Sequence, residues 1–330
     1  MVKIGIIGLG FIGRMHLATL RKLGLAQVTA VADKQPENLS GASGAAGNIA
    51  VNEAGLSLEG VKTFDDGTTL LAEADVDAVL IALPTHLHCT YAVQALQAGT
   101  HVICEKPLVR SSEEGDRLLE ALASTDRQLY VAQCIRFWPV YEKAREIILG
   151  GDYGPVRSAH FQRTSPKPTW SWRNWLLDDT KSGGCILDLH IHDVDYVRYL
   201  FGDPADVTAQ GIVDAQEGVG DVLACYRYAD GKAVSLESGW NHAEAYPFRM
   251  AFRIVLEQAV LEFNTRTDGR LHVYHGKNDE TPPLDAEDGY CREHRHFIAC
   301  IEAGRASDCV TPEDALASVR LVERERALIK

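Results

Sequence analysis

The fold is decided by residues 2–13, which read V-K-I-G-I-I-G-L-G-F-I-G. The apolar run over 2–7 predicts a buried strand, and the glycines that follow predict a tight turn that opens a helix. Asp33 stands at the end of a second apolar run, about 20 residues after Gly13. Strand, glycine turn, helix and acidic residue in this order form the dinucleotide-binding fingerprint of a Rossmann fold.

Each glycine has a physical role in such a turn. Gly8 permits the tight turn, Gly10 lets the backbone approach a pyrophosphate, and Gly13 allows the helix to pack closely on the strand. The helix begins near Phe11 and Ile12, where free N–H groups and the helix dipole favour a bound phosphate. The alternative is a structural glycine turn that binds nothing.

The acidic residue predicts which cofactor binds. Asp33 can accept hydrogen bonds from the adenosine ribose hydroxyls and would repel a 2′-phosphate, so the sequence favours NAD over NADP. Lys34 is its neighbour and can partly offset a phosphate charge. NADP therefore stays open as an alternative cofactor.

Apolar strand patterns alternate with helical patterns in the first part of the chain, which is typical of a parallel sheet covered on both faces. Over residues 34–60 we expect a helix and a loop. After about residue 135, strand-like runs follow one another directly, with Asp230-Gly231 as one of the hairpin turns between them. One strong helix is expected over residues 183–201.

These patterns predict an α/β protein of two domains. Residues 1–125 would form a doubly wound Rossmann domain that binds NAD(P). Residues 126–330 would form an α+β domain with a large, open, mainly antiparallel sheet that binds the substrate and carries the oligomer contacts.

Charge and composition exclude several kinds of partner. Lysine and arginine number 33 against 46 aspartates and glutamates, a formal net charge of −13, which argues against nucleic acid or an anionic membrane as the main partner. No apolar run approaches the roughly 18 residues that a membrane span requires. The eight cysteines form no C-x-x-C pair, and no signal peptide precedes the first strand, so we expect a cytoplasmic protein with reduced thiols.

The segment Glu105-Lys106-Pro107 follows the apolar run at 101–104. It would lie at the carboxyl end of a parallel strand, where open α/β sheets bind their ligands. Pro107 restricts Lys106 to non-helical conformations, and a lysine there can polarise a substrate oxygen or share its proton. A solvated surface lysine is the alternative interpretation.

The segment G-G-C-I-L-D-L-H-I-H-D-V-D at 183–195 is the second candidate for chemistry. On one continuous helix, Asp188, His192 and Asp195 share a face, and acid, imidazole and acid together suit proton transfer. A capped amphipathic helix with solvated polar residues is one alternative. A metal site is another, but His190 and His192 point about 200° apart on a helix, so we predict no metal.

These motifs together resemble the glucose–fructose oxidoreductase / inositol dehydrogenase family, Gfo/Idh/MocA. The resemblance extends over essentially the whole chain. It rests on the glycine turn, on L-P-T-H-L-H at 83–88, on A-L-Q-A-G-T-H-V-I-C-E-K-P-L at 95–108, on the 183–195 segment, and on T-P-E-D-A-L at 311–316.

The resemblance implies an NAD(P)-dependent dehydrogenase, a small-molecule substrate such as a sugar, inositol or related polyol, and homodimers or homotetramers built through the second sheet. It implies a catalytic group of Lys106, Asp188 and His192. The residues implied for the nicotinamide end of the cofactor are Leu83, Pro84, Thr85, His86, Glu105 and Lys106.

The substrate itself is the least determined part of the prediction. Candidates for substrate contact are Arg136, Trp172, Arg173, His190 and Asp195, with Trp138, Trp170, Trp175 and His294 as further pocket lining. Core packing or an interface is the alternative for each. A trans-dihydrodiol-type or other non-sugar dehydrogenase and a non-enzymatic NAD-binding regulator remain as alternative functions.

Overall fold

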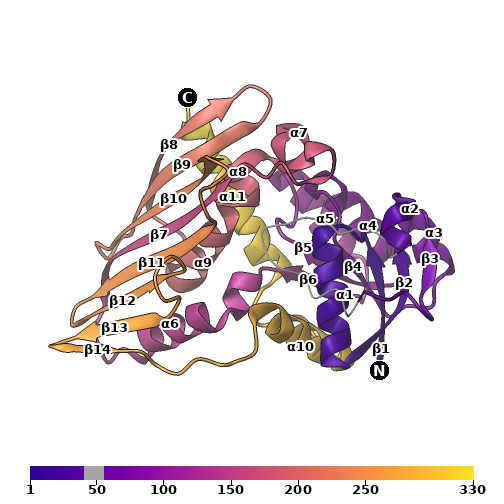
Figure 1. Ribbon diagram of the computed structural model, residues 1–330, viewed down its shortest axis with the longest axis horizontal. Helices are drawn as coiled ribbons and strands as arrows, with labels where there is room; N and C mark the ends of the chain where they lie inside the picture. The colour runs from indigo at the N-terminus through magenta and orange to yellow at the C-terminus, as the bar shows by residue number, and fades with distance from the viewer. Residues whose placement is uncertain (41–55) are drawn as a thin grey trace. The chain divides into compact units, whose positions relative to one another are not determined.

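The computed structural model describes residues 1–40 and 56–330, so the helix and loop expected over 34–60 lie partly outside the described residues. The chain forms two compact units (Figure 1). Unit 1 comprises residues 1–134, 170–175 and 290–319, and unit 2 comprises residues 135–169, 176–289 and 320–330.

Unit 1 contains a six-stranded sheet in which every neighbouring pair is parallel. Its strands are β1 (Val2–Ile7), β2 (Ala26–Ala32), β3 (Lys62–Phe64), β4 (Ala78–Ile81), β5 (His101–Glu105) and β6 (Leu129–Ala132). The order β3-β2-β1-β4-β5-β6 is that of a dinucleotide-binding Rossmann sheet. The predicted parallel sheet is therefore confirmed.

Helices connect these strands. They are α1 (Phe11–Leu23), α2 (Pro36–Leu39), α3 (Gly67–Glu73), α4 (His88–Gln97) and α5 (Ser112–Ala123). The end of the chain returns to this unit with α10 (Gly289–Glu302) and the first part of α11 (Pro312–Leu328). Tyr130 at the sheet edge packs against Phe297 and donates a hydrogen bond to the carbonyl of Arg305.

Unit 2 contains an eight-stranded sheet, and the predicted large, mainly antiparallel sheet is confirmed. Its strands are β7 (Val156–Pro166), β8 (Asp206–Asp214), β9 (Gly218–Arg227), β10 (Ala233–His242), β11 (Arg249–Leu256), β12 (Ala259–Asn264), β13 (Leu271–His275) and β14 (Asn278–Glu280). Only β7 and β10 pair in parallel. Asp230-Gly231 lies in the turn that follows β9, as expected, and Asp268-Gly269 lies in the turn that follows β12.

In the part of the chain that the structure describes, one face of this sheet is covered by helices and the other is bare. Helices α6 (Pro139–Gly150) and α9 (Ile191–Phe201) lie on the covered face, and Figure 1 shows no described helix on the opposite face. Burial alternates along the strands accordingly: in β9, Ala224 and Tyr226 are buried, whereas Leu223 and Cys225 are exposed. We call the bare side the outer face.

The prediction of one continuous helix over 183–201 is wrong. The segment forms α8 (Gly184–Asp188) and then α9, with Leu189 and His190 between them. The amide of His190 donates to the carbonyl of Cys185, five residues back, instead of the carbonyl four residues back. Such a π-type turn adds a residue locally and rotates α9 relative to α8.

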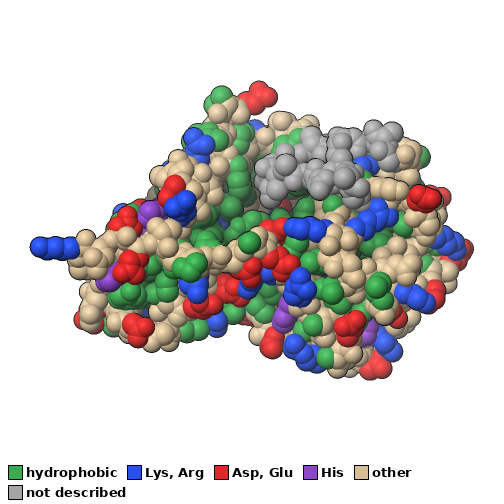
Figure 2. All heavy atoms as spheres, turned by 60° about the horizontal axis from the view of Figure 1, so that its bottom comes forward, with side chains coloured by type: hydrophobic (Ala, Val, Ile, Leu, Met, Phe, Trp, Pro, Cys, Tyr) green, Lys and Arg blue, Asp and Glu red, His purple; other side chains and the backbone are tan. Residues whose placement is uncertain are grey.

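Two further features concern the surface. Within the described parts of the chain, no helix is both long and apolar enough to cross a membrane. On the face shown in Figure 2, aspartates and glutamates are interspersed with lysines and arginines.

The glycine turn depends on close packing of α1 against the end of β1. A Cβ atom at Gly13 would lie 2.0 Å from the carbonyl oxygen of Gly8. Gly8 has a φ of +97°, and a Cβ there would lie 2.5 Å from the carbonyl oxygen of Ala82. A Cβ at Gly10 would meet no described atom within 4 Å.

We predict that Gly13→Ala lowers the free energy of unfolding by about 2 kcal/mol, because the clash is with backbone that cannot rotate away. Gly10→Ala is the matched control and should stay within about 0.5 kcal/mol of the wild type. Urea unfolding followed by circular dichroism measures both. Equal losses in the two variants would contradict the packing role of Gly13.

Candidate active site

The glycine turn leaves the start of α1 open to an anion. Gly10 precedes the helix, and among the described residues no side chain caps its first turn, so the first N–H groups are available to a phosphate. The open space above Gly10 would let a pyrophosphate approach the backbone. The residues present therefore fit a dinucleotide.

Asp33 lies at the end of β2 and holds the turn. Its Oδ2 accepts a hydrogen bond of 2.7 Å from the amide of Leu9, and its Oδ1 accepts one of 2.7 Å from the amide of Gln35. Both oxygens retain further lone pairs for ribose hydroxyls. Lys34 lies 3.6 Å from the carboxylate of Asp66, which partly neutralises the charge that a 2′-phosphate would need.

The loop that follows β4 carries the residues expected at the nicotinamide end. Thr85 is buried and His86 is half-buried. His88, which the sequence analysis left without a role, connects this loop to the next one. Its Nε2 lies 2.8 Å from the carbonyl of Leu83 and its Nδ1 lies 2.8 Å from the carbonyl of Pro107.

The loop that follows β5 carries Glu105 and Lys106. Glu105 is buried, and its Oε2 accepts a hydrogen bond of 2.9 Å from the amide of Lys106. Its Oε1 lies 2.7 Å from Nε2 of His16, a residue that the sequence analysis missed. Burial alone would raise the pKa of Glu105, but the hydrogen bond from His16, followed by the charge of Lys106, lowers it below its usual value.

Asp188 and His192 differ from their neighbours in burial. Over residues 183–198 they are the two side chains that keep partial exposure, and every other residue of that range is buried. Asp188 ends α8, and His192 lies in the first turn of α9. Asp188 and His192 thus differ in exposure from the rest of this polar segment.

Arg136 and Asp195 form a buried pair. The Nε and Nη2 of Arg136 lie 2.8 and 2.7 Å from the two carboxylate oxygens of Asp195. Arg163 on β7 holds Asp193 in the same forked way, at 3.0 and 2.8 Å. Asp195 therefore does not share the partly exposed position of Asp188 and His192. Substrate contact by this pair stays a prediction that the geometry does not favour.

His190 points into the interior of unit 2. Its Nδ1 lies 2.9 Å from the hydroxyl of Ser238 on β10, and its Nε2 lies 3.3 Å from Oε1 of Glu325 on α11. The same carboxylate accepts a hydrogen bond from the hydroxyl of Tyr226. Because His190 is wholly buried and its two ring nitrogens have these neighbours, it has a structural role in this conformation.

The Trp-rich segment belongs to unit 1. The ring of Trp170 contacts that of Phe11 at a centroid distance of 5.6 Å, which places the segment beside the glycine turn. The guanidinium of Arg173 stands 4.7 Å from the ring of Trp172, which is 49% exposed. Arg173 and Asn174 both have positive φ, at 51° and 53°, a conformation that non-glycine residues rarely adopt.

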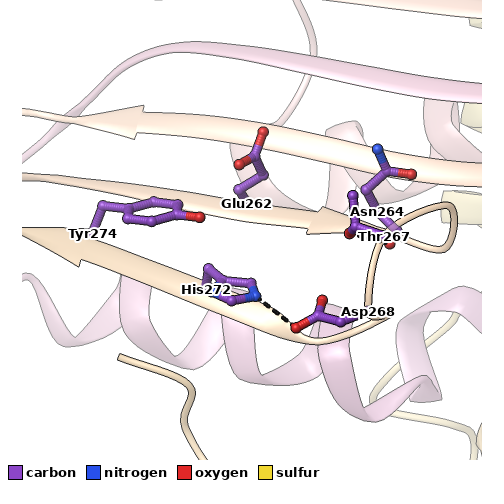
Figure 3. A pocket seen from close by; sticks show the side chains of 6 residues that line it. All are labelled: Glu262, Asn264, Thr267, Asp268, His272 and Tyr274. Atoms are coloured by element: carbon purple, nitrogen blue, oxygen red, sulfur yellow. Dashed lines mark hydrogen bonds and ion pairs between the residues drawn. The ribbon is translucent and has the colours of Figure 1, made fainter. Parts of the chain in front are cut away.

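The outer face of the sheet contains a polar hollow of about 280 Å³ (Figure 3). It is lined by Glu262, Asn264, Thr267, Asp268, His272 and Tyr274. The hydrogen bonds of His272 to Asp279 and then to Asp268 raise the pKa of its imidazole. The hollow contains none of the predicted catalytic residues.

No cluster of three or more His, Cys, Asp or Glu side chains among the described residues could hold a metal ion.

Family models match both parts of the chain. The model described as "Oxidoreductase family, NAD-binding Rossmann fold" matches residues 2–133, and the "GFO/IDH/MocA C-terminal domain" matches residues 141–262. The chain belongs to the Gfo/Idh/MocA oxidoreductases. It is therefore a member of a family of NAD-binding enzymes, and the resemblance drawn from its motifs is confirmed.

Members of this family that resemble the chain include enzymes of sugar chemistry. The inositol 2-dehydrogenase of Rhizobium meliloti is 27% identical over 98% of this chain and 95% of its own length. The solved UDP-N-acetylglucosamine 3-dehydrogenase of Acidithiobacillus ferrooxidans is 25% identical, has a TM-score of 0.79, and aligns over 99% of this chain and 97% of its own. A levoglucosan dehydrogenase in complex with NADH and L-sorbose has a TM-score of 0.85 at 21% identity and shares the fold.

We predict that Asp33→Ala raises the Kd for NAD roughly tenfold and shifts the preference of this Gfo/Idh/MocA oxidoreductase toward NADP. The variant would lose a charged acceptor for the ribose and the repulsion of a 2′-phosphate. Titrating the protein with NADH and with NADPH by nicotinamide fluorescence measures both affinities. Asp65→Ala, which removes an exposed carboxylate nearby, is the control, and an unchanged NADH/NADPH ratio in Asp33→Ala would contradict the ribose role.

Proposed function

We propose that the protein oxidises a secondary alcohol of a sugar, inositol or related polyol, or reduces the corresponding ketone. The observation that carries the proposal is the selective exposure of Asp188 and His192 in an otherwise buried segment of an NAD-binding oxidoreductase. The names of the inositol 2-dehydrogenase and UDP-N-acetylglucosamine 3-dehydrogenase relatives support this substrate class.

The nicotinamide cofactor supplies the hydride chemistry when it is bound. Glycines 8, 10 and 13, with Phe11, Ile12 and Asp33, would hold its pyrophosphate and ribose, and the loops after β4 and β5 would hold its nicotinamide end. Fixing both ends orients the reacting ring, which lowers the entropic cost of reaction.

The proposed catalytic group divides the remaining work. His192 takes the proton from the substrate hydroxyl, because an imidazole exchanges protons near neutral pH. Lys106 stabilises the negative charge that develops on the substrate oxygen. Asp188 accepts a hydrogen bond from a substrate hydroxyl or from the imidazole, and so orients both. In the reductive direction, His192 returns the proton.

The Trp-rich segment supplies candidate contacts to the substrate. Trp172 and Arg173 are exposed beside the glycine turn, and an indole face suits the apolar face of a sugar ring. Arg173 can in addition bind a carboxylate or phosphate on the substrate. We keep both residues as proposed substrate contacts and leave out the wholly buried His190.

A substrate panel tests the proposal. The purified protein is assayed for NADH formation at 340 nm with inositols, hexoses, pentoses and dihydrodiols, with NAD and NADP in parallel. We expect turnover of one inositol or sugar with NAD. Turnover of dihydrodiols alone would favour the non-sugar dehydrogenase, and tight NADH binding without any turnover would favour a regulator.

We predict that Lys106→Ala and His192→Ala each lower kcat about 100-fold or more, while the Kd for NADH changes little. Each variant removes a group needed in the transition state and leaves the dinucleotide turn intact. Lys143→Ala and His275→Ala, which remove a lysine and a histidine from surface ion pairs, are the controls. Near-normal kcat in either of the first two variants would rule out the catalytic role of that residue.

We propose further that the chain forms a homodimer or homotetramer through the outer face. Support comes from the lack of a described helix over that face and from the exposed Leu223 at its surface. Large uncovered sheet faces commonly pack against another subunit.

The eight cysteines are all free thiols, which supports a reducing compartment such as the cytoplasm.

We predict that Leu223→Asp shifts the protein to a smaller species in size-exclusion chromatography with light scattering, because a charge at a buried interface is costly. Leu223 is 59% exposed in the single chain. Leu149→Asp is the control, since Leu149 is 63% exposed but lies on α6. A wild-type monomer, or equal behaviour of both variants, would contradict the interface.

A further inference from the structure

Three buried side chains of unit 1 form a chain of hydrogen bonds that ends at the peptide of Lys106. Nε2 of His294 on α10 lies 2.7 Å from Nδ1 of His16 on α1. Nε2 of His16 lies 2.7 Å from Oε1 of Glu105, and Oε2 of Glu105 accepts the amide hydrogen of Lys106 at 2.9 Å. Both imidazoles are wholly buried. The contacts of His16 with His294 and with Glu105 join separate elements, whereas the contact of Glu105 with Lys106 joins neighbouring residues.

The donors in this chain can be assigned from chemistry. An ionised Glu105 only accepts hydrogen bonds, so His16 donates to it through Nε2. Burial lowers the pKa of His294 well below its usual value, so His294 is neutral and has one N–H. Among the described residues, Nδ1 of His294 has no hydrogen-bond partner. Its proton therefore belongs on Nε2, from which it donates to Nδ1 of His16.

The neighbouring Glu293 influences which carboxyl group of this cluster is ionised. Glu293 is wholly buried, and neither of its carboxylate oxygens has a hydrogen-bond partner in the described part of the chain. Burial, and then the nearby Glu105, raise the pKa of Glu293 well above its usual value. Two like charges in one dry cluster are unfavourable, so Glu293 stays protonated and Glu105 is the ionised member. The hydrogen bonds of the chain all favour this distribution of charge.

We propose that His16 and His294 are positioning residues, which fix the peptide of Lys106 through the carboxylate of Glu105. The chain has a further consequence, because His16 stands on the helix whose N-terminus forms the dinucleotide turn. Helix α1 thereby positions the N–H groups that would bind phosphate. Through His16 it also positions the carboxylate of Glu105, which accepts the amide hydrogen of Lys106. The catalytic meaning of the chain rests on the proposed function, but the hydrogen bonds themselves do not.

Amide hydrogen exchange of Lys106, read at single-residue resolution, tests the proposal without any substrate. His294→Leu removes the donor to His16, whereas His294→Gln keeps an N–H donor of similar reach. His296→Leu is the control, since His296 lies on the same helix but bonds to Ser307. We expect exchange at Lys106 about tenfold faster in His294→Leu, and close to the wild-type rate in the other two variants.

Steady-state kinetics with the substrate found in the panel give the second readout. We expect kcat of His294→Leu to fall about tenfold, with the Kd for NADH within about threefold of wild type and kcat largely restored in His294→Gln. A purely structural histidine would lower the melting temperature without this split between kcat and Kd.

Two outcomes would overturn the proposal. One is a wild-type exchange rate at Lys106 in His294→Leu, and the other is equally faster exchange in His296→Leu, which would indicate general loosening of the helix. If the panel yields no substrate, the proposed function fails, while the exchange experiment still decides whether the hydrogen-bond chain holds Lys106.

Discussion

The close contact between Gly13 and the carbonyl of Gly8 is the constraint on which unit 1 depends. Because no Cβ intervenes, α1 can start directly above the end of β1. That position puts Leu9 within reach of Asp33 and His16 within reach of Glu105. Helix α1 therefore positions both the glycine turn and the loop that carries Lys106. Its own position requires that residue 13 has no side chain.

Unit 2 buries several charged side chains beside its sheet. Arg136 with Asp195, and Arg163 with Asp193, pair through two hydrogen bonds each, so neither charge is left unsatisfied. These pairs anchor α9 firmly. The π-type turn at His190 separates α8 from α9, and Asp188 and His192, one on each side of it, keep partial exposure.

The sequence predicted the parts of this structure that depend on local patterns. The glycine turn, the place of Asp33 at the end of the second strand and the two sheets follow from spacing and apolar periodicity, and they are confirmed. The break at His190 was not predicted, and the residues that its side chain contacts, Ser238 and Glu325, are distant in sequence.

The same limit applies to the site. A buried ion pair such as Arg136 with Asp195 uses the same residue types as a solvated polar face, so composition cannot separate them. His16 and His294 are 278 residues apart, and only the folded chain shows that they touch. A histidine in the second turn of α1 was the signal available for His16, and His294 was expected to line a pocket and not to contact His16.

The return of residues 290–319 to unit 1 has a consequence for synthesis. Gly115 on α5 meets the side chain of Leu316, and Tyr130 meets Phe297 and Arg305, so the surface of the Rossmann sheet is completed by the last part of the chain to be made. A ribosome that has produced only the first 134 residues has made every strand of that sheet without its cover. The N-terminal unit, although first to emerge, cannot complete its packing until residues 290–319 have been made.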